Sequence, residues 1–296
     1  MDDEKAEIRL GTCAFSANGW QGAFYPKGMK SADCLNFYST RFDTVEVDST
    51  FYRCPTIEAV NNWHFKTPPG FVFSLKIPRT ITHDKILLDC DAEFEQFVDT
   101  VDILQEKLGP MLFQFPYFGP DVFDNDAQFV ARLKAFFLKL PKIGPYRFAV
   151  EIRNKFWLKP RLLDLLRENN VALALQAHSY MPGPEIFEKF DPITADFAYV
   201  RLLGDRKGIE NLTMVWNQTI IDKTAELQSW VTVCEKIQKL GIKQYIYANN
   251  HYAGFSPATV ELFRSLCKER GIETPINVRL PFIIEGTLFD MSGSSN

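Results

Sequence analysis

The sequence predicts a single α/β domain folded as a (β/α)8 TIM-type barrel, and three observations indicate this architecture. Short apolar runs rich in β-branched and aromatic residues alternate with longer amphipathic segments along the chain. Eight such runs are present, which is the strand number of a closed parallel barrel. The 296 residues suffice for one barrel, so we expect one domain over 1–296, with a core at about 8–268 and a C-terminal tail at 272–296.

The elements follow one another in the order strand, loop, helix. Strands are expected at 8–15, 44–52, 71–79, 110–118, 146–154, 171–179, 197–205 and 244–252. Helices are expected at 31–42, 56–65, 93–109, 127–140, 160–170, 225–241 and 256–271. Ser31 and Thr56 are suitable N-caps, and Gly109, Gly241 and Gly271 follow the last periodic residue of their helices. This repeated order is typical of a barrel that ends in a helix.

A doubly wound open sheet is the competing architecture. Such a sheet usually has five or six strands and often carries a glycine-rich turn after the first one. Here the first strand runs into GTCAFSANGW, which lacks the G-x-G-x-x-G motif. The strand number and the missing motif both favour the closed barrel.

Composition and charge narrow the classes of partner. The formal net charge of −4 and the isoelectric point near 5.7 provide no general field for nucleic acid or an anionic membrane. The segment MDDEKAEIRL lacks an apolar signal region, and no stretch approaches the roughly 18 apolar residues of a membrane span. We therefore expect a cytoplasmic protein with a small-molecule substrate and no membrane partner; nucleic acid is disfavoured but not excluded.

The six cysteines are scattered and form no Cys-x-x-Cys pair. A chain of this size folds without disulfide bonds, so we expect reduced thiols and no structural metal. Cys13, at the end of the first expected strand, is the only cysteine that we single out.

Strand parity explains why the second strand, TVEVDSTFY, carries acidic residues. Alternate side chains of a barrel strand point to the helices outside and to the interior. In this strand Val45 and Val47 share one parity, whereas Glu46 and Asp48 share the other. The other strands repeat the pattern, and the polar parity includes Lys76, Gln114, Glu151, Arg153, His178, Arg201 and Asn249. We expect the aliphatic parity to face the helices and the polar parity to face inward.

The inward set is balanced in charge. Three acids stand against three bases, namely Glu46, Asp48 and Glu151 against Lys76, Arg153 and Arg201. Burying an ion costs several kcal/mol that pairing only partly offsets, so stability alone would favour a hydrophobic filling. Two interpretations remain open: a structural salt-bridge network on the barrel floor, or a polar pocket at the C-terminal face, where barrel active sites lie.

Loops at the same end of the barrel add further candidates. They carry Trp20, Arg79, His83, Trp157, Asn250 and His251, and Tyr52 at the end of the second expected strand is a further candidate. Aromatic rings offer flat walls to a sugar or base, and arginines bind carboxylate or phosphate with two hydrogen bonds. Ordinary packing is the alternative interpretation for each aromatic residue. The long connection at 206–223 is a candidate lid.

The missing motifs limit the chemistry. The chain has no G-x-S-x-G, no P-loop and no H-E-x-x-H, which leaves acid–base catalysis by carboxylates. Glu46, Asp48 and Glu151 are the candidate catalytic residues. His83, His178 and His251 fall at expected strand ends but have no metal-ligand spacing, so we expect no metal and no cofactor.

The segments VEVDSTFY, FSLKIPRTITH, GPMLFQFP, FAVEIRNKFW, YVRLLGD and YIYANNH occur in an order that resembles the YecE-like family, a domain of unknown function numbered seventy-two. The resemblance runs from about residue 8 to 265 and implies a TIM-type barrel without an assigned reaction. It maps the family's motif positions onto Glu46, Ser49, Thr50, Tyr52, Lys76, Thr82, His83, Gln114, Pro116, Glu151, Arg153, Trp157, Arg201, Gly204, Asn249, Asn250 and His251. The chain departs from the family pattern at Cys13, Phe15 and Ala248, and at Leu203, where histidine is frequent; His178 is a candidate substitute.

Three functions are compatible with these residues. The leading hypothesis is a metal-independent hydrolase or lyase acting on a small molecule with an anionic or polyhydroxylated part. In it, Arg153 and Arg201 hold the anion, one of the three carboxylates transfers protons, and Asn249 with His251 orients the substrate. The alternatives are a metal-dependent phosphodiesterase or DNA-repair nuclease, by analogy with other TIM barrels, and a non-catalytic binding protein.

Overall fold

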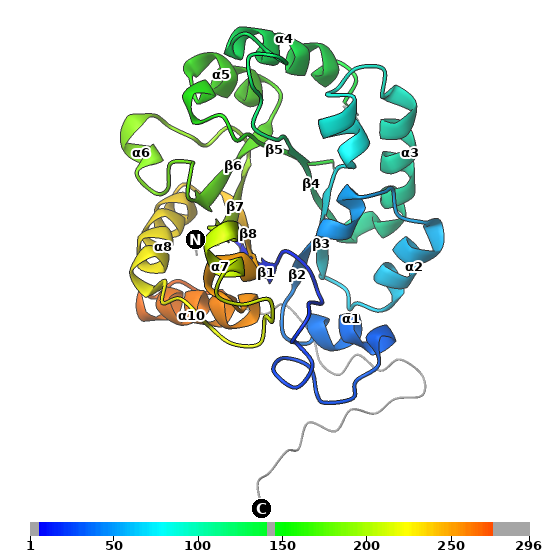
Figure 1. The fold of residues 1–296 in the computed structure, drawn as a ribbon, viewed down its shortest axis with the longest axis vertical. Helices are drawn as coiled ribbons and strands as arrows, with labels where there is room; N and C mark the ends of the chain where they lie inside the picture. Colours follow the sequence, from blue (N-terminus) through cyan, green and yellow to red (C-terminus); the bar gives the residue numbers. More distant parts are fainter. Residues whose placement is uncertain (1–5, 141–145, 275–296) are drawn as a thin grey trace, which may run out of the picture.

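The structure is a computed structural model that describes residues 6–140 and 146–274, and its centre is a closed barrel of parallel strands (Figure 1). The strands are β1 (Ile8–Thr12), β2 (Thr44–Val47), β3 (Val72–Lys76), β4 (Leu108–Gln114), β5 (Phe148–Glu151), β6 (Val171–His178), β7 (Phe197–Gly204) and β8 (Lys243–Ala248). They pair in chain order, and β1 pairs with β8 to close the ring. The predicted (β/α)8 barrel is confirmed. The expected tail lies outside the described residues from 275 onward.

Helices surround the strands, as Figure 1 shows. They are α1 (Ser31–Ser39), α2 (Ile57–Phe65), α3 (Asp91–Val101), α4 (Asp126–Phe137), α5 (Pro160–Glu168), α6 (Ile186–Lys189), α7 (Arg206–Glu210), α8 (Thr224–Lys239), α9 (Asn250–Ala253) and α10 (Ser256–Glu269). Thr56 is the N-cap of α2, because its hydroxyl accepts a hydrogen bond from the N–H of Ala59 at 3.1 Å. The predicted cap at Ser31 is wrong, since Lys30 precedes the first helical residue. Gly109 lies inside β4 and not at a helix end.

All eight expected strands end earlier than predicted, and two of these corrections, at β2 and β8, move expected site residues out of the sheet. The run 44–52 leaves the sheet after Val47 and continues as a 3-10 helix, η1 (Asp48–Phe51). The run 244–252 leaves the sheet after Ala248, and Asn249 caps α9 through its side-chain oxygen. Asp48 and Asn249 therefore lie in turns at the C-terminal mouth of the barrel, because local side-chain hydrogen bonds end strands that their apolar pattern would extend.

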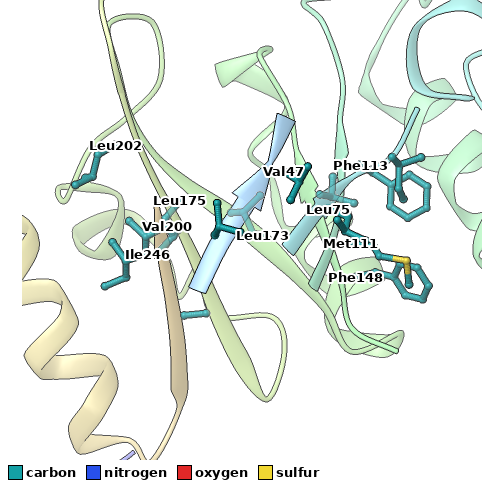
Figure 2. Close-up of a cluster of buried hydrophobic side chains, with 14 of the residues drawn as sticks. Val47, Leu75, Met111, Phe113, Phe148, Leu173, Leu175, Val200, Leu202 and Ile246 are labelled. Atoms are coloured by element: carbon teal, nitrogen blue, oxygen red, sulfur yellow. The ribbon is translucent and has the colours of Figure 1, made fainter. Parts of the chain in front are cut away.

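The apolar core has two parts. Val47, Leu75, Val200 and Ile246 belong to a large cluster that packs the strands against the helices (Figure 2). A smaller cluster of inward-facing side chains, including Leu112 and Tyr199, fills the barrel interior. The parity assigned from the sequence is thus confirmed for these strands. Fully burying one large aliphatic side chain stabilises the fold by about 1.5–3 kcal/mol, so the larger cluster is the main support of the barrel.

Candidate functional site

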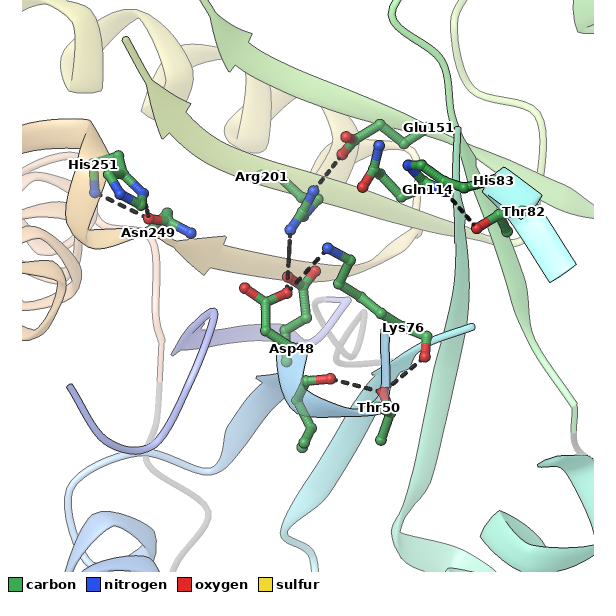
Figure 3. A network of polar contacts seen from close by, with 12 residues as sticks. Asp48, Thr50, Lys76, Thr82, His83, Gln114, Glu151, Arg201, Asn249 and His251 are labelled. Atoms are coloured by element: carbon green, nitrogen blue, oxygen red, sulfur yellow. Dashed lines mark hydrogen bonds and ion pairs between the residues drawn. The ribbon is translucent and has the colours of Figure 1, made fainter. Parts of the chain in front are cut away.

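Arg201 lies at the centre of a buried ion network that crosses the barrel (Figure 3). Its Nη1 is 2.6 Å from Oε2 of Glu151, and its Nη2 is 2.6 Å from Oε1 of Glu46. The hydroxyl of Tyr199 donates to Oε2 of Glu46 at 2.7 Å. Both carboxylates are fully buried. Strands β2, β5 and β7 bring these side chains together because each one has the inward parity at its position.

Glu151 and Arg201 of this network are held in their ionised forms. Burial alone would raise the pKa of Glu151, but the neighbouring Arg153 and Arg201 outweigh it and lower the pKa. Burial also opposes the charge of Arg201, yet Glu151 and Glu46 raise its pKa well above the usual value. A group that stays charged and fully paired is poorly suited to exchanging protons. Glu46 and Glu151 thus have the geometry of the structural interpretation, a salt-bridge network below the mouth.

Asp48 lies above this network, and its side chain remains 33% exposed. Its Oδ1 is 3.4 Å from Nζ of Lys76 and 3.8 Å from Nη2 of Arg201. Burial and the nearby charge of Glu46 raise the pKa of Asp48, although Lys76 and Arg201 oppose the shift. Asp48 therefore combines access to solvent with a carboxyl group that protonates more readily than usual.

Arg153 borders the same mouth. Its Nη2 is 2.5 Å from Oε1 of Glu151, while the side chain as a whole is 20% exposed. Its Nη1 is buried and has no hydrogen-bond acceptor in the described part of the chain. Gln176 on β6 is in a similar position, since its Nε2 donates to the carbonyl of Ile152 at 3.0 Å while its Oε1 has no donor among the described residues. Such unpaired buried groups are uncommon, and a bound ligand or water would satisfy them.

Two histidines near the mouth are neutral. Burial, followed by the charge of Lys76, lowers the pKa of His83 to about 4. Burial, followed by the charge of Arg153, lowers the pKa of His178 to about 4. The Nδ1 atom of His178 accepts a hydrogen bond from the backbone N–H of Tyr180 at 3.2 Å, so its proton resides on Nε2. His178 can therefore donate a hydrogen bond to a ligand without carrying a charge.

Three of the expected site residues are packed away from the mouth. Trp20 is buried, and its Nε1 donates to Oδ1 of Asn250 at 3.3 Å. The same oxygen accepts from the backbone N–H of Ser256 at 3.0 Å, so Asn250 joins the first loop to α10. Trp157 stacks on Phe129 in the outer core, with ring centroids 5.1 Å apart. For Trp20 and Trp157 the structure agrees with ordinary packing and not with an open binding wall.

His251 is fixed between two acceptors. Oδ1 of Asn249 accepts from the backbone N–H of His251 at 3.0 Å and lies 2.6 Å from its Nδ1 (Figure 3). The Nε2 atom of His251 is 3.1 Å from Oε1 of Glu210 on α7. Burial, followed by the charge of Arg206, lowers the pKa of His251. Asn249 and His251 thus tie α9 to α7 at one side of the mouth.

The connection at 206–223 is attached to its neighbours. The backbone N–H of Trp216 donates to the carbonyl of Asn18 at 2.9 Å, and that of Ile220 donates to the carbonyl of Ala253 at 2.7 Å. The candidate lid is therefore hydrogen-bonded to the first loop and to α9.

The remaining expected residues are in several surroundings, and Tyr199 and Gln176 join the site without having been predicted. Arg79 pairs with Asp84 at 3.0 Å with both side chains about half exposed, and Tyr52 is 73% exposed. Nε2 of Gln114 donates to the carbonyl of Phe115 at 2.8 Å. Tyr199 and Gln176 were not among the expected site residues, although their strand parity is the one that selected Arg201 and His178.

The geometry gives no support to a metal centre. Within residues 6–140 and 146–274, no group of three or more histidine, cysteine, aspartate or glutamate side chains is close enough to hold a metal ion. All six cysteines lie in this part of the chain and are free thiols. None of the described helices is both long and apolar enough to span a membrane.

Comparison with known proteins agrees with the fold. YecE of Escherichia coli K12 is 31% identical over 121 residues, which cover 40% of this chain and 41% of that protein. YunF of Bacillus subtilis 168 is 31% identical over 150 residues, which cover 48% of this chain and 51% of that protein. The matched region thus spans about half the length of these curated relatives.

Solved structures show the same barrel. A DUF72 family protein from Thermotoga maritima MSB8 superposes with a TM-score of 0.69 at 23% identity, covering 88% of this chain and 99% of the other. A DUF72 family protein from Enterococcus faecalis V583 gives a TM-score of 0.67 at 21% identity, covering 88% and 95%. At these identities the likeness concerns the fold alone. The family model described as "Protein of unknown function DUF72" matches residues 9–279, and the chain belongs to this family.

Proposed function

We propose that this protein is a metal-independent enzyme, a hydrolase or lyase, that uses Asp48 for proton transfer on a polar small molecule with an anionic or polyhydroxylated part. One observation carries the proposal. Asp48 is a partly exposed carboxyl group with a raised pKa, and it lies beside Lys76 above the buried ion network of Arg201, Glu46 and Glu151. A raised pKa brings a carboxyl group nearer to the range in which a general acid or base works best.

The three candidate carboxylates take different roles in this proposal. Glu46 and Glu151 hold Arg201 in a fixed position, and the lowered pKa of Glu151 keeps that carboxylate ionised. Asp48 exchanges protons, and the Lys76 ammonium 3.4 Å away stabilises the negative charge that Asp48 carries whenever it has given up its proton. Stabilising a charge that changes during the reaction with a preorganised neighbour is a general device of enzyme active sites.

Arg153 and the neutral histidines bind and orient the substrate in this proposal. The unpaired Nη1 of Arg153 is a donor for a carboxylate or phosphate oxygen. Nε2–H of His178 and the free Oε1 of Gln176 are suited to sugar hydroxyl groups, which both donate and accept hydrogen bonds. These uncommitted atoms support a ligand that carries both an anion and hydroxyl groups.

The metal-dependent phosphodiesterase needs converging metal ligands, and the described residues do not supply such a group. A non-catalytic binding protein would use the same side chains at the mouth but would not depend on the proton affinity of Asp48. The metal-independent enzyme and the non-catalytic binding protein therefore differ in the effect expected when the Asp48 carboxyl group is neutralised.

The test begins with a panel of sugar acids, sugar phosphates and their glycosides, screened for binding by thermal shift and for turnover by mass spectrometry. With any substrate found, we expect Asp48→Asn to retain the melting temperature and ligand affinity of the wild type but to lose at least 100-fold in kcat, in line with general acid–base catalysis. Asp84→Asn is the matched control, because Asp84 pairs with Arg79 at the exposed rim. Equal kcat for Asp48→Asn and the wild type would contradict the proposal.

A further inference from the structure

A hollow lies beside the barrel mouth, between the 3-10 turn η4 (Lys155–Trp157) after β5 and the segment from β6 to α6. Its volume is about 410 Å³, and its lining includes Lys155, Phe156, Tyr180, Glu185, Lys189 and Phe190. This volume falls within the range of small-molecule pockets, which is about 300–1,000 Å³. We call this hollow the outer pocket.

The outer pocket has exposed aromatic walls. Phe156 is 78% exposed and Tyr180 is 70% exposed. Large apolar side chains that remain exposed together on a soluble surface often mark a binding site. Flat rings of this kind stack on the apolar face of a sugar ring. The aromatic residues thus favour a ring-shaped ligand.

The pocket also has a positive charge excess. Lys155 and Lys189 line it, and within the described ranges neither ammonium group has a carboxylate at ion-pair distance. Nζ of Lys155 lies 5.1 Å from the centre of the Phe156 ring. The single acid of the lining, Glu185, accepts a hydrogen bond from the N–H of Gly183 at 2.9 Å and is thereby held in its own turn. Two unpaired cations beside one engaged carboxylate match a ligand with negative charge.

The outer pocket is connected to the mouth through His178. The rings of His178 and Tyr180 are 5.6 Å apart between centroids. A smaller hollow of about 260 Å³ is lined by His178, Gly204 and Asp205 and shares Ser179, Met181 and Glu185 with the outer pocket. A ligand that occupies the mouth can therefore extend over the end of β6 into the outer pocket.

We infer that the outer pocket is a second subsite for an anionic, pyranose-sized ring, so that the substrate is an acidic oligosaccharide and not a single sugar. The inference that the bound molecule is also the substrate rests on the proposed function. Binding of the ring in the outer pocket does not require turnover. The negative group on the ring is a carboxylate, as in a uronic acid, or a sulfate ester. The chemistry shared by both is an oxyanion attached to a ring with an apolar face.

The experiment measures binding by titration calorimetry with three probes: a tri-uronate, a sulfated trisaccharide and a neutral trisaccharide of matched length. Each is compared with its monosaccharide. We expect at least one anionic trisaccharide to bind ten times more tightly than its monosaccharide and than the neutral trisaccharide. The preferred anionic probe identifies the negative group. Equal affinity for trisaccharide and monosaccharide, or no binding of either anionic trisaccharide, would overturn the inference.

Variants of the outer pocket test whether its side chains cause the higher affinity for the anionic trisaccharide. Lys155→Gln with Lys189→Gln, and separately Phe156→Ala with Tyr180→Ala, should each reduce trisaccharide affinity about tenfold and leave monosaccharide affinity unchanged. The matched control is Lys134→Gln with Lys236→Gln, which removes two exposed lysines from α4 and α8. Equal trisaccharide affinity for the control and both pocket variants would overturn the inference. Asp48→Asn separates the two proposals: tight trisaccharide binding with unchanged turnover would contradict the proposed catalysis but support the subsite.

Discussion

Arg201 shows how one residue organises the interior. It pairs with Glu46 and Glu151 on opposite sides, each at 2.6 Å, and all three side chains are almost completely buried. Its charge lowers the cost of burying the two carboxylates, and their charges do the same for Arg201. Every charge has a partner of opposite sign. Removing one member therefore leaves another charge buried without a partner, which is strongly unfavourable because the buried charge stays desolvated.

Arg201→Met tests this dependence. The variant removes the common partner of Glu46 and Glu151, so we expect the free energy of unfolding to fall by about 3–5 kcal/mol. Arg79→Met is the control, because the Arg79–Asp84 pair is about half exposed and its loss should cost less than about 1 kcal/mol. Urea unfolding of both variants measures the difference. Equal losses would show that the buried network contributes no more than a surface pair.

His178 gives a prediction for pH. Its pKa is about 4 in the folded protein, compared with an ordinary value of 6.5. The unfolded chain therefore binds a proton more readily than the folded one between these values. The contribution of neutral His178 is fully present above pH 6.5 and is lost as the pH falls toward 4.

We expect His178→Asn to weaken the pH dependence of stability in that window. The free energy of unfolding, measured by urea titration from pH 7 to 4, should decrease less steeply in the variant than in the wild type. Above pH 6.5 the difference between the two proteins should be constant. Parallel curves down to pH 4 would contradict the lowered pKa.

At the scale of elements, the turn after β2 determines where Asp48 lies. The hydroxyl of Thr50 is 2.9 Å from the carbonyl of Val47 and 2.7 Å from the carbonyl of Lys76, within donating distance of both. It thereby links η1 to the ends of β2 and β3 (Figure 3). Lys76 is also the ion-pair partner of Asp48. One hydroxyl thus fixes the relative position of the two charged groups.

Thr50→Val removes this hydroxyl at nearly constant volume. We expect a loss of about 1–2 kcal/mol in stability, because buried carbonyls lose a donor, and at least a tenfold loss in kcat on any substrate of the wild type. Thr56→Ala is the matched control: it removes the N-cap of α2, should cost about 1 kcal/mol, and should leave kcat unchanged. An equal effect of both variants on kcat would contradict a positioning role for Thr50.

At the scale of the whole molecule, charge distinguishes the enzyme proposed here from a nuclease. A net charge of −4 provides little electrostatic attraction for a polyanion. We expect DNA binding weaker than a Kd of about 10⁻⁴ M at physiological salt, measured by fluorescence anisotropy. The outer pocket has an excess of positive charge from its two lysines, and this local charge suits a short anionic ligand and not a long polyanion. Micromolar binding with a steep dependence on salt would instead favour the nucleic-acid alternative.

The sequence predicted the barrel well because strand number, helix order and side-chain parity are all periodic signals. The inward positions of Glu46, Glu151 and Arg201 follow from parity alone. The ends of β2 and β8 were predicted too late in the chain. Thr50 and Asn249 end these strands through local hydrogen bonds, and the pattern of apolar residues gives no information on such bonds. The burial of loop side chains could not be predicted either, since it depends on contacts between segments far apart in the chain.

The titration of Asp48 decides whether this carboxyl group can transfer protons beside an anion site. The carboxyl signals of protein labelled with ¹³C-aspartate are followed by NMR as a function of pH, and Asp48→Asn assigns the resonance. We expect a pKa above the ordinary 3.8, and a further increase when a sugar acid such as galacturonate binds near Arg153 and adds negative charge. A pKa at or below 3.8, or one that does not change as the sugar acid binds, would contradict a proton-transferring carboxyl group beside an anion site.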